Sequence, residues 1–375
     1  MSHPTLAANV PLTGERMLIS DKYRPVYETD MLALEEVLQG PISGTSEAVS
    51  AYEEALAAWF DAREAIAVSS GAAALSVALY AAGVRAGDEV ILTPGCPLCT
   101  VYPIIAASAR PVFVDTRAHG FGADLQAVRD AVTCRTKAII DIPMWGYPTE
   151  VDELHTVAGM LGVTLILDLA HAHGATLHGQ PLSHYGDLSC FSTHERKPLA
   201  TGEGGFILTN DRGLAQRCRS HSRFGNLNGR DFGLNYKLAA LPAALGHSRL
   251  AMLSDQIAQR RENARTFMSQ LAHPKVRERK IIDGGRPNYY FLNLEIDFAD
   301  NRAFIDYLDD CGIPSDIKRY GCKALYEFAQ LAPYRRACPN AEQLLAGMTT
   351  IPVHPAVTAA ELDYMAACIN RYPAQ

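Results

Sequence analysis

Short runs of apolar, often β-branched residues alternate with helical patterns through the middle of the chain. Seven runs have the length and composition of buried strands, at 65–69, 89–93, 111–115, 138–142, 164–168, 187–191 and 205–209. Helical patterns such as 72–82 and 150–161 separate the earlier runs. This alternation predicts an α/β fold with a mostly parallel seven-stranded sheet and helices on both faces.

The pattern changes near the end of the predicted sheet. The strands at 187–191 and 205–209 are joined by a loop without a helical pattern, and we expect the chemistry to lie in that loop. A long helical stretch at 238–271 follows. Later elements are predicted at 289–296 (strand), 301–311 (helix), 350–353 (strand) and 359–369 (helix). We therefore expect a large domain, 1–237 with its N-terminal segment, and a connecting helix with a smaller α+β domain, 238–375.

Composition narrows the class of protein. With 48% hydrophobic and 20% charged residues, the 375-residue chain is neither disordered nor fibrous. The formal charge of −7 argues against nucleic acid as a partner. Nine scattered cysteines do not form a disulfide framework, no secretory leader is visible, and no apolar run approaches the ~20 residues that span a bilayer. We expect a soluble, cytoplasmic protein with no membrane partner.

Three segments have residue types that carry chemistry. In the first, Ser69-Ser70-Gly71-Ala72, a predicted strand meets a helix through small residues. Free N–H groups and a positive dipole end at such a helix start favour a bound phosphate, although tight packing alone also explains small residues there.

The second segment is Asp168 at the end of a buried strand, followed by His171 and His173. A buried carboxylate needs a cation or several donors, and a protonated pyridine nitrogen is one such cation. Two other interpretations are a capping Asp with core histidines, and a metal site of all three residues. The metal site is disfavoured, because three ligands so close in sequence rarely converge after a strand end. We predict no metal.

In the third segment, four residues separate Lys197 from a Gly-Glu-Gly-Gly turn that starts at Gly202. A lysine that is partly desolvated near another cation, here the adjacent Arg196, has a lowered pKa and can form a Schiff base. A loop lysine taken alone is usually solvated surface. The order of a phosphate turn, a strand-end Asp and a loop Lys matches what pyridoxal 5'-phosphate (PLP) requires.

Nearly the whole chain resembles the fold-type I, PLP-dependent aminotransferases of the DegT/StrS family, which are aspartate aminotransferase-like in fold and include sugar aminotransferases and 3-amino-5-hydroxybenzoate synthases. The segments that carry the resemblance are 69–75, 87–94, 110–115, 167–175, 191–211, 233–238 and 351–355. The resemblance implies that Lys197 is the Schiff-base lysine and that Asp168 pairs with the pyridine nitrogen. It also implies that His171 lies against the ring near its phenolic oxygen.

The resemblance further implies a phosphate site and a homodimer with shared active sites. The implied phosphate ligands are Ser70, Gly71, Ala72 and Ser192, and the implied ligand from the neighbouring subunit is Asn235. Ala72 stands where the family has Thr, Leu98 stands where it has a ring-stacking aromatic, and Lys237 stands where it commonly has Arg. Retention of Lys197 argues against the dehydratase branch, in which a His replaces this lysine.

The spacing of Cys96 and Cys99 also suits redox chemistry or half a zinc site. No second CxxC pair exists, and the resemblance places this one beside the cofactor ring, which favours an apolar lining.

These features predict an aminotransferase that moves an amino group from Glu or Gln to the ketone of a sugar, a nucleotide-sugar or a cyclitol. One alternative is another Schiff-base reaction with PLP, such as a lyase, cyclisation or aromatising step on a specialised metabolite. A non-catalytic regulator with this fold is a third hypothesis, which the intact Lys197 and Asp168 disfavour. The sequence does not identify the ketone, the donor or the pathway.

Overall fold

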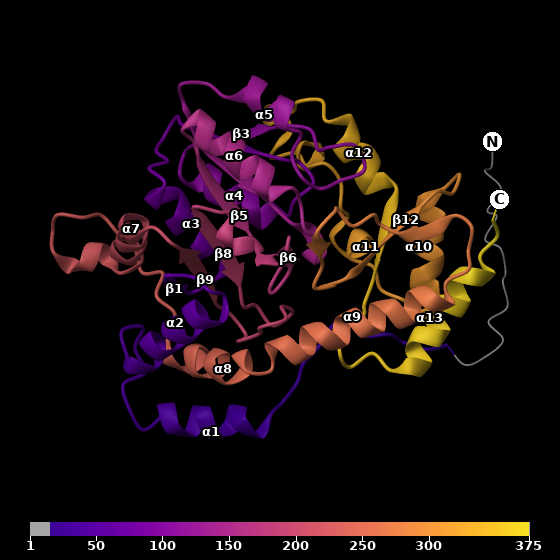
Figure 1. The fold of residues 1–375 in the computed structure, drawn as a ribbon, viewed down its shortest axis with the longest axis horizontal. Coiled ribbons are helices and arrows are strands. Elements are labelled where there is room, and N and C mark those ends of the chain that lie inside the picture. Colours follow the sequence, from indigo (N-terminus) through magenta and orange to yellow (C-terminus); the bar gives the residue numbers. More distant parts are fainter. Residues whose placement is uncertain (1–15, 375) are drawn as a thin grey trace.

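The computed structural model describes residues 16–374, and its centre is a seven-stranded sheet (Figure 1). The strands are β1 (Glu64–Val68), β2 (Glu89–Leu92), β3 (Arg110–Phe113), β4 (Thr136–Asp141), β5 (Thr164–Asp168), β8 (Leu188–Ser192) and β9 (Gly205–Thr209). Their order in the sheet is β1-β9-β8-β5-β4-β2-β3. All neighbours pair in parallel except β9, which is antiparallel to both β8 and β1. The mostly parallel sheet is confirmed, with each predicted strand found within about two residues of its expected bounds.

Helices cover both faces of this sheet because its strands are apolar on both sides. In β1, Ile66 belongs to one hydrophobic cluster, whereas Ala65 and Ala67 belong to another. In β5, Ile166 and Leu165 divide between the two clusters in the same way. The surrounding helices are α2 (Glu47–Trp59), α3 (Gly71–Ala81), α4 (Leu98–Ala106), α5 (Leu125–Ala131), α6 (Val151–Leu161) and α7 (Arg212–Ser222).

The helical stretch predicted at 238–271 is two helices, so the expectation of a single helix is wrong. Helix α8 (Ala240–Leu250) ends at a tight turn, in which the N–H of Met252 donates to the carbonyl of Arg249 at 3.0 Å. Helix α9 (Leu253–Gln270) then runs towards the C-terminal elements (Figure 1). The turn lets α8 pack on α2 and on α1 (Glu28–Val37), while α9 packs on α13 (Ala359–Arg371).

The residues after α9 build an antiparallel sheet in the order β10-β12-β13. Its strands are β10 (Val276–Glu278), β12 (Leu292–Ile296) and β13 (Met348–Ile351), and the helices of this part are α10 (Asn301–Asp310), α11 (Asp316–Tyr320), α12 (Pro339–Ala346) and α13. One hydrophobic cluster runs without a break from Ile66 in the large sheet to Leu292 and Ile351 in the small one. The two sheets therefore share a core.

A third, small sheet joins these parts beside the large one. It consists of β11 (Gly285–Arg286), β6 (Thr176–Leu177) and β7 (Gln180–Pro181). Pairing of β11 with β6 brings the chain after residue 282 against the turn that follows β5. This contact positions the segment before β12, which begins at Leu292 rather than at the predicted residue 289.

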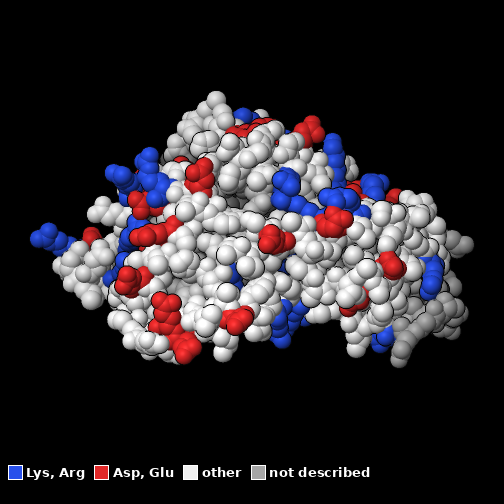
Figure 2. Space-filling model, turned by 60° about the horizontal axis from the view of Figure 1, so that its bottom comes forward, with Lys and Arg blue, Asp and Glu red and all other residues white. Residues whose placement is uncertain are grey.

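Charged side chains of both signs are interspersed among broad uncharged areas on the face drawn in Figure 2. Within residues 16–374, no helix is long and apolar enough to cross a membrane.

Candidate active site

The start of α3 faces the end of β8 and forms a cradle. Ser70 caps the helix, because its Oγ accepts a hydrogen bond from the N–H of Ala73 at 3.0 Å. A Cβ built on Gly71 would lie only 2.7 Å from the Cβ of Ser192, so a glycine is required for this close approach. The first N–H groups of a helix have no partner within the helix, and together with the Ser192 hydroxyl they suit the oxygens of a phosphate.

Asp168 ends β5 and is almost completely buried. Its Oδ2 accepts a hydrogen bond from Thr100 Oγ1 at 2.7 Å, and its Oδ1 accepts one from the N–H of Ala170 at 3.2 Å. Burial raises the pKa of Asp168, while these two donors and Lys197 oppose the shift. The carboxylate therefore lacks a full set of partners and is suited to a cationic ring nitrogen. The sequence analysis missed Thr100, which is 68 residues away and comes from α4.

Lys197 extends from the loop between β8 and β9 into the same cavity as Asp168, whose volume is about 280 Å³. Burial lowers the pKa of Lys197 to about 8, although the fields of Cys99 and Asp168 act in the opposite direction. Its Nζ lies 4.8 Å from the centre of the Tyr290 ring. The neutral form of the amine, which a nucleophile requires, is therefore far more populated near physiological pH than in an exposed lysine.

His171 lies at the edge of this cavity and is held on two sides. Its Nδ1 accepts a hydrogen bond from the N–H of Trp145 at 3.2 Å, and its ring stacks on Tyr290 with centroids 4.7 Å apart. Burial keeps the His171 pKa well below its usual value, so the ring is neutral. His171 also lines an adjoining cavity of about 340 Å³.

A strained segment fixes Tyr290 against His171. The amide Nδ2 of Asn288, which is fully buried, donates to the carbonyls of His171 and His173 at 2.9 Å each, and the N–H of Tyr290 donates to Asn288 Oδ1. Tyr289, the residue between them, has a left-handed φ of 52°. Such a conformation in a bulky residue persists only where the surroundings enforce it. Sequence reasoning missed this segment, because nothing local marks it.

His173 is a core residue and not a ligand. It is fully buried and packs edge-on against the stacked rings of Phe191 and Phe206, and burial lowers its pKa to about 3. Neither of its ring nitrogens has a hydrogen-bond partner among the described residues. Within that part of the chain, no group of three or more His, Cys, Asp or Glu side chains could hold a metal ion.

Leu98 begins α4 and lines only the adjoining cavity. The structure instead brings Pro97 and Cys99 to the wall beside Asp168. Burial raises the pKa of Cys96 well above its usual value, and the nearby Asp168 charge acts in the same direction. All nine cysteines are free; Cys99 lines both cavities, whereas Cys96 lines only the adjoining one.

The adjoining cavity is shared between the loop of Lys197 and the C-terminal elements. Arg196 forms ion pairs with Asp21 at 2.7 Å and with Asp316 at 3.1 Å, and the Trp145 indole N–H donates to Asp316 at 3.2 Å. The aromatic lining residues are Trp145, Tyr290, Tyr320 and Phe328. Lys197 lines both cavities, so its amine lies where they meet.

Asn235 does not reach either cavity within this chain. Its side chain is exposed, and its Oδ1 accepts a hydrogen bond from Lys237 Nζ at 2.7 Å. Of the nine residues that the sequence singled out, Ser70, Gly71, Ala72, Asp168, His171, Ser192 and Lys197 converge on one cavity.

Comparison with known proteins identifies relatives over nearly the whole chain. A model of the family described as the DegT/DnrJ/EryC1/StrS aminotransferase family matches residues 26–370. The GDP-perosamine synthase of Escherichia coli O157:H7 is 27% identical over 363 residues, which cover 94% of this chain and 99% of that protein.

Solved structures also resemble this chain over nearly its whole length. The sugar aminotransferase CalS13 from Micromonospora echinospora superposes with a TM-score of 0.87 at 25% identity, over 95% of this chain and 100% of that one. DesI, solved in the presence of its TDP-sugar product, has a TM-score of 0.89 at 27% identity, over 96% and 94% of the two chains. The predicted family and fold type are confirmed.

We predict that Gly71→Ala lowers the affinity for PLP by more than about tenfold, because the new methyl group collides with Ser192 in the phosphate cradle. Titration of the apoenzyme with PLP, followed by absorbance, measures this affinity. Gly40→Ala is the matched control, since a Cβ there meets no heavy atom within 4 Å. Equal affinities of the two variants would contradict the cradle.

The lowered pKa of Lys197 predicts how its reaction with an amine reagent depends on pH. In the apoenzyme, acylation of Lys197 by an amine reagent should reach half its maximal rate near pH 8, because burial favours the neutral amine. Asp168→Asn should lower this midpoint further, since the carboxylate stabilises the ammonium form. Mass spectrometry of the labelled peptides measures both, with exposed Lys137 as the comparison in the same digest. A Lys197 midpoint that coincides with that of Lys137 would refute a desolvated amine.

Proposed function

Because the chain belongs to the DegT/DnrJ/EryC1/StrS aminotransferase family, we propose that it transfers an amino group from glutamate or glutamine to the ketone of a sugar, nucleotide-linked or free, or of a cyclitol. One observation carries this proposal: a lysine with a pKa of about 8 shares a cavity with a buried carboxylate and a helix N-terminus. CalS13 is a sugar aminotransferase, DesI forms a TDP-sugar product and the Escherichia coli relative is a GDP-perosamine synthase, which together support a sugar as the acceptor.

The residues present fit PLP, which when bound supplies an electrophilic carbonyl and a ring that accepts electrons. Ser70, Gly71, Ala72 and Ser192 would hold its phosphate, since the cradle between α3 and β8 excludes any side chain at Gly71. Asp168 would keep the pyridine nitrogen protonated, because an opposite charge raises the pKa of that nitrogen. Its hydrogen bonds to Thr100 and Ala170 fix the direction of the carboxylate.

Lys197 carries the proton in this proposal. Its Nζ takes a proton from the α-carbon of the amino donor, and in the second half of the reaction it returns one to the acceptor carbon. Because Lys197 lines both cavities, the same amine can exchange a proton with the α-carbon of the donor and with the carbon of the acceptor. The stacked rings of His171 and Tyr290 limit the movement of the lysine and keep bulk water away from its amine.

A homodimer with shared sites is part of the proposal. The segment around Asn235 exposes apolar side chains, namely Phe224, Leu227, Phe232 and Leu234. Contiguous exposed apolar residues favour a protein interface. Asn235 of each chain would then reach the phosphate held by its partner, which would add a donor where Ala72 lacks the hydroxyl of the family's threonine.

We predict that Asp168→Asn retains PLP but lowers the rate of the glutamate half-reaction by at least about a hundredfold, since the ring nitrogen loses its counter-charge. Stopped-flow absorbance of the holoenzyme mixed with glutamate, with pyridoxamine phosphate identified by chromatography, measures this step. Asp283→Asn removes an exposed carboxylate and serves as control. If the wild-type holoenzyme forms no pyridoxamine phosphate from glutamate or glutamine, the proposed transamination is wrong.

Shared sites predict that two inactive variants restore activity when they are mixed. A Lys197→Ala chain paired with an Asn235→Asp chain contains one intact site, with the lysine and the asparagine from different subunits. Refolding the two variants together should yield roughly a quarter of the wild-type activity, because half of the dimers are mixed and each has one intact site. Full activity in a monomer, or no recovery in proven mixed dimers, would exclude sharing.

A further inference from the structure

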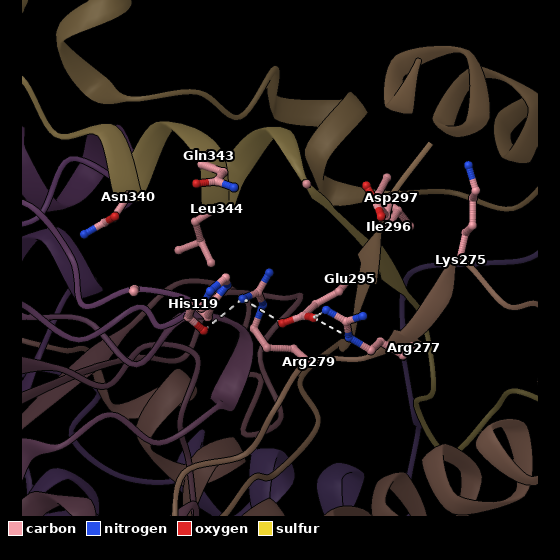
Figure 3. A pocket seen from close by; sticks show the side chains of 12 residues that line it. His119, Lys275, Arg277, Arg279, Glu295, Ile296, Asp297, Asn340, Gln343 and Leu344 are labelled. Atoms are coloured by element: carbon pink, nitrogen blue, oxygen red, sulfur yellow. Dashed lines mark hydrogen bonds and ion pairs between the residues drawn. The ribbon is translucent and has the colours of Figure 1, made fainter. Parts of the chain in front are cut away.

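A third cavity lies between the small antiparallel sheet and α12, and the aminotransferase reaction does not use it. Its volume is about 280 Å³. Figure 3 shows basic side chains from the edge of the sheet on one wall, and Asn340, Gln343 and Leu344 of α12 on the other. The charged or titratable residues that line it are His119, Lys275, Arg277, Arg279, Glu295 and Asp297.

Positively charged side chains outnumber carboxylates in this cavity. Arg277 lies in the edge strand β10, and Lys275 and Arg279 flank it at alternate positions, so the three side chains emerge on the same face of the sheet. The Glu295 carboxylate forms ion pairs with both arginines, at 2.7 Å from Arg277 and 3.4 Å from Arg279. Lys275 has no carboxylate within ion-pair distance in residues 16–374. Three cations therefore face two carboxylates, of which one is divided between two guanidinium groups.

Arg279 is the buried component of the cavity. Its side chain is only 5% exposed, and its Nε has no hydrogen-bond partner in the described part of the chain. Its Nη1 donates to the His119 carbonyl at 3.1 Å, and its guanidinium lies 5.3 Å from the centre of the Phe121 ring. An unpaired buried donor is unfavourable, so Arg279 keeps an unused hydrogen-bonding group beside the cavity. Burial also lowers the pKa of Arg279, and an anion beside it would reverse that shift.

We propose that this cavity binds a small oxyanion, the phosphate or carboxylate group of a metabolite. A guanidinium presents paired N–H donors that match the oxygens of either group. Lys275 supplies an unshared charge, and the exposed amide of Gln343 supplies a donor from the opposite wall. The proposal is independent of the aminotransferase function.

Helix α12 places this site next to the adjoining cavity that Lys197 and Arg196 line. Leu344 lines the proposed anion site, whereas the next residue, Leu345, lines the cavity that contains Tyr290 and Arg196. The helix is anchored at its start, where the N–H groups of Asn340 and Ala341 donate to Asp115 at 3.1 and 3.0 Å. An anion bound against one side of α12 therefore lies one helix away from the adjoining cavity.

The test is calorimetric titration of the holoenzyme at constant ionic strength with inorganic phosphate and, separately, with succinate. The holoenzyme is required because bound PLP occupies the phosphate cradle at α3. Gln343→Glu places a carboxylate in the cavity from an exposed position, so it preserves the fold and should weaken binding by about tenfold or more. Gln343→Lys should tighten binding. A stronger response to phosphate or to succinate identifies which of the two groups the site prefers.

Arg302→Gln is the control, since it removes an exposed charge on α10 that does not line the cavity. Binding that weakens in Gln343→Glu, strengthens in Gln343→Lys and is unchanged in Arg302→Gln supports the site. Two outcomes overturn it: no saturable binding of either anion to the wild-type holoenzyme, or binding that changes equally in all three variants.

Discussion

The burial of a carboxylate and an amine in one cavity is the constraint on which the rest of the site depends. Asp168 and Lys197 both leave bulk water, which raises the pKa of the acid and lowers that of the amine. Hydrogen bonds from the Thr100 hydroxyl and the Ala170 N–H offset part of the cost of burying the Asp168 carboxylate. In the proposed function, the remaining imbalance favours a cofactor that carries both a cationic nitrogen and an electrophilic carbonyl.

The direction of β9 explains why Lys197 can occupy this position. In a parallel sheet, β8 and its neighbour would need a crossover helix, which would carry the chain away from the strand ends. Because β9 returns antiparallel to β8, the connecting loop stays at the edge where β5 also ends. Lys197 and Asp168 therefore line the same cavity, although they are 29 positions apart in the sequence.

Sequence patterns predicted the sheet and most of the residues that meet at one cavity, because strand periodicity and the Lys197 motif are local. They did not predict Thr100, Asn288 or Tyr290, whose roles depend on contacts with residues far away in the chain. They also missed the division between α8 and α9, since the turn at residues 251–252 contains neither glycine nor proline and follows from packing on different partners. The resemblance singled out Leu98 by its position in the motif. In the structure, the residues on either side of it, Pro97 and Cys99, line the cavity of Asp168, whereas Leu98 lines only the adjoining one.

The hydrophobic cluster that runs from the large sheet to the small one bears on how the protein loses its structure. Since Ile66, Leu292 and Ile351 belong to one cluster, residues on both sides of α9 bury the same apolar surface. The C-terminal third therefore has no separate core with which to melt first, and heating should produce a single cooperative transition. A truncation within α13 would then lower the unfolding temperature of the whole chain, cofactor cradle included, instead of releasing an intact large sheet.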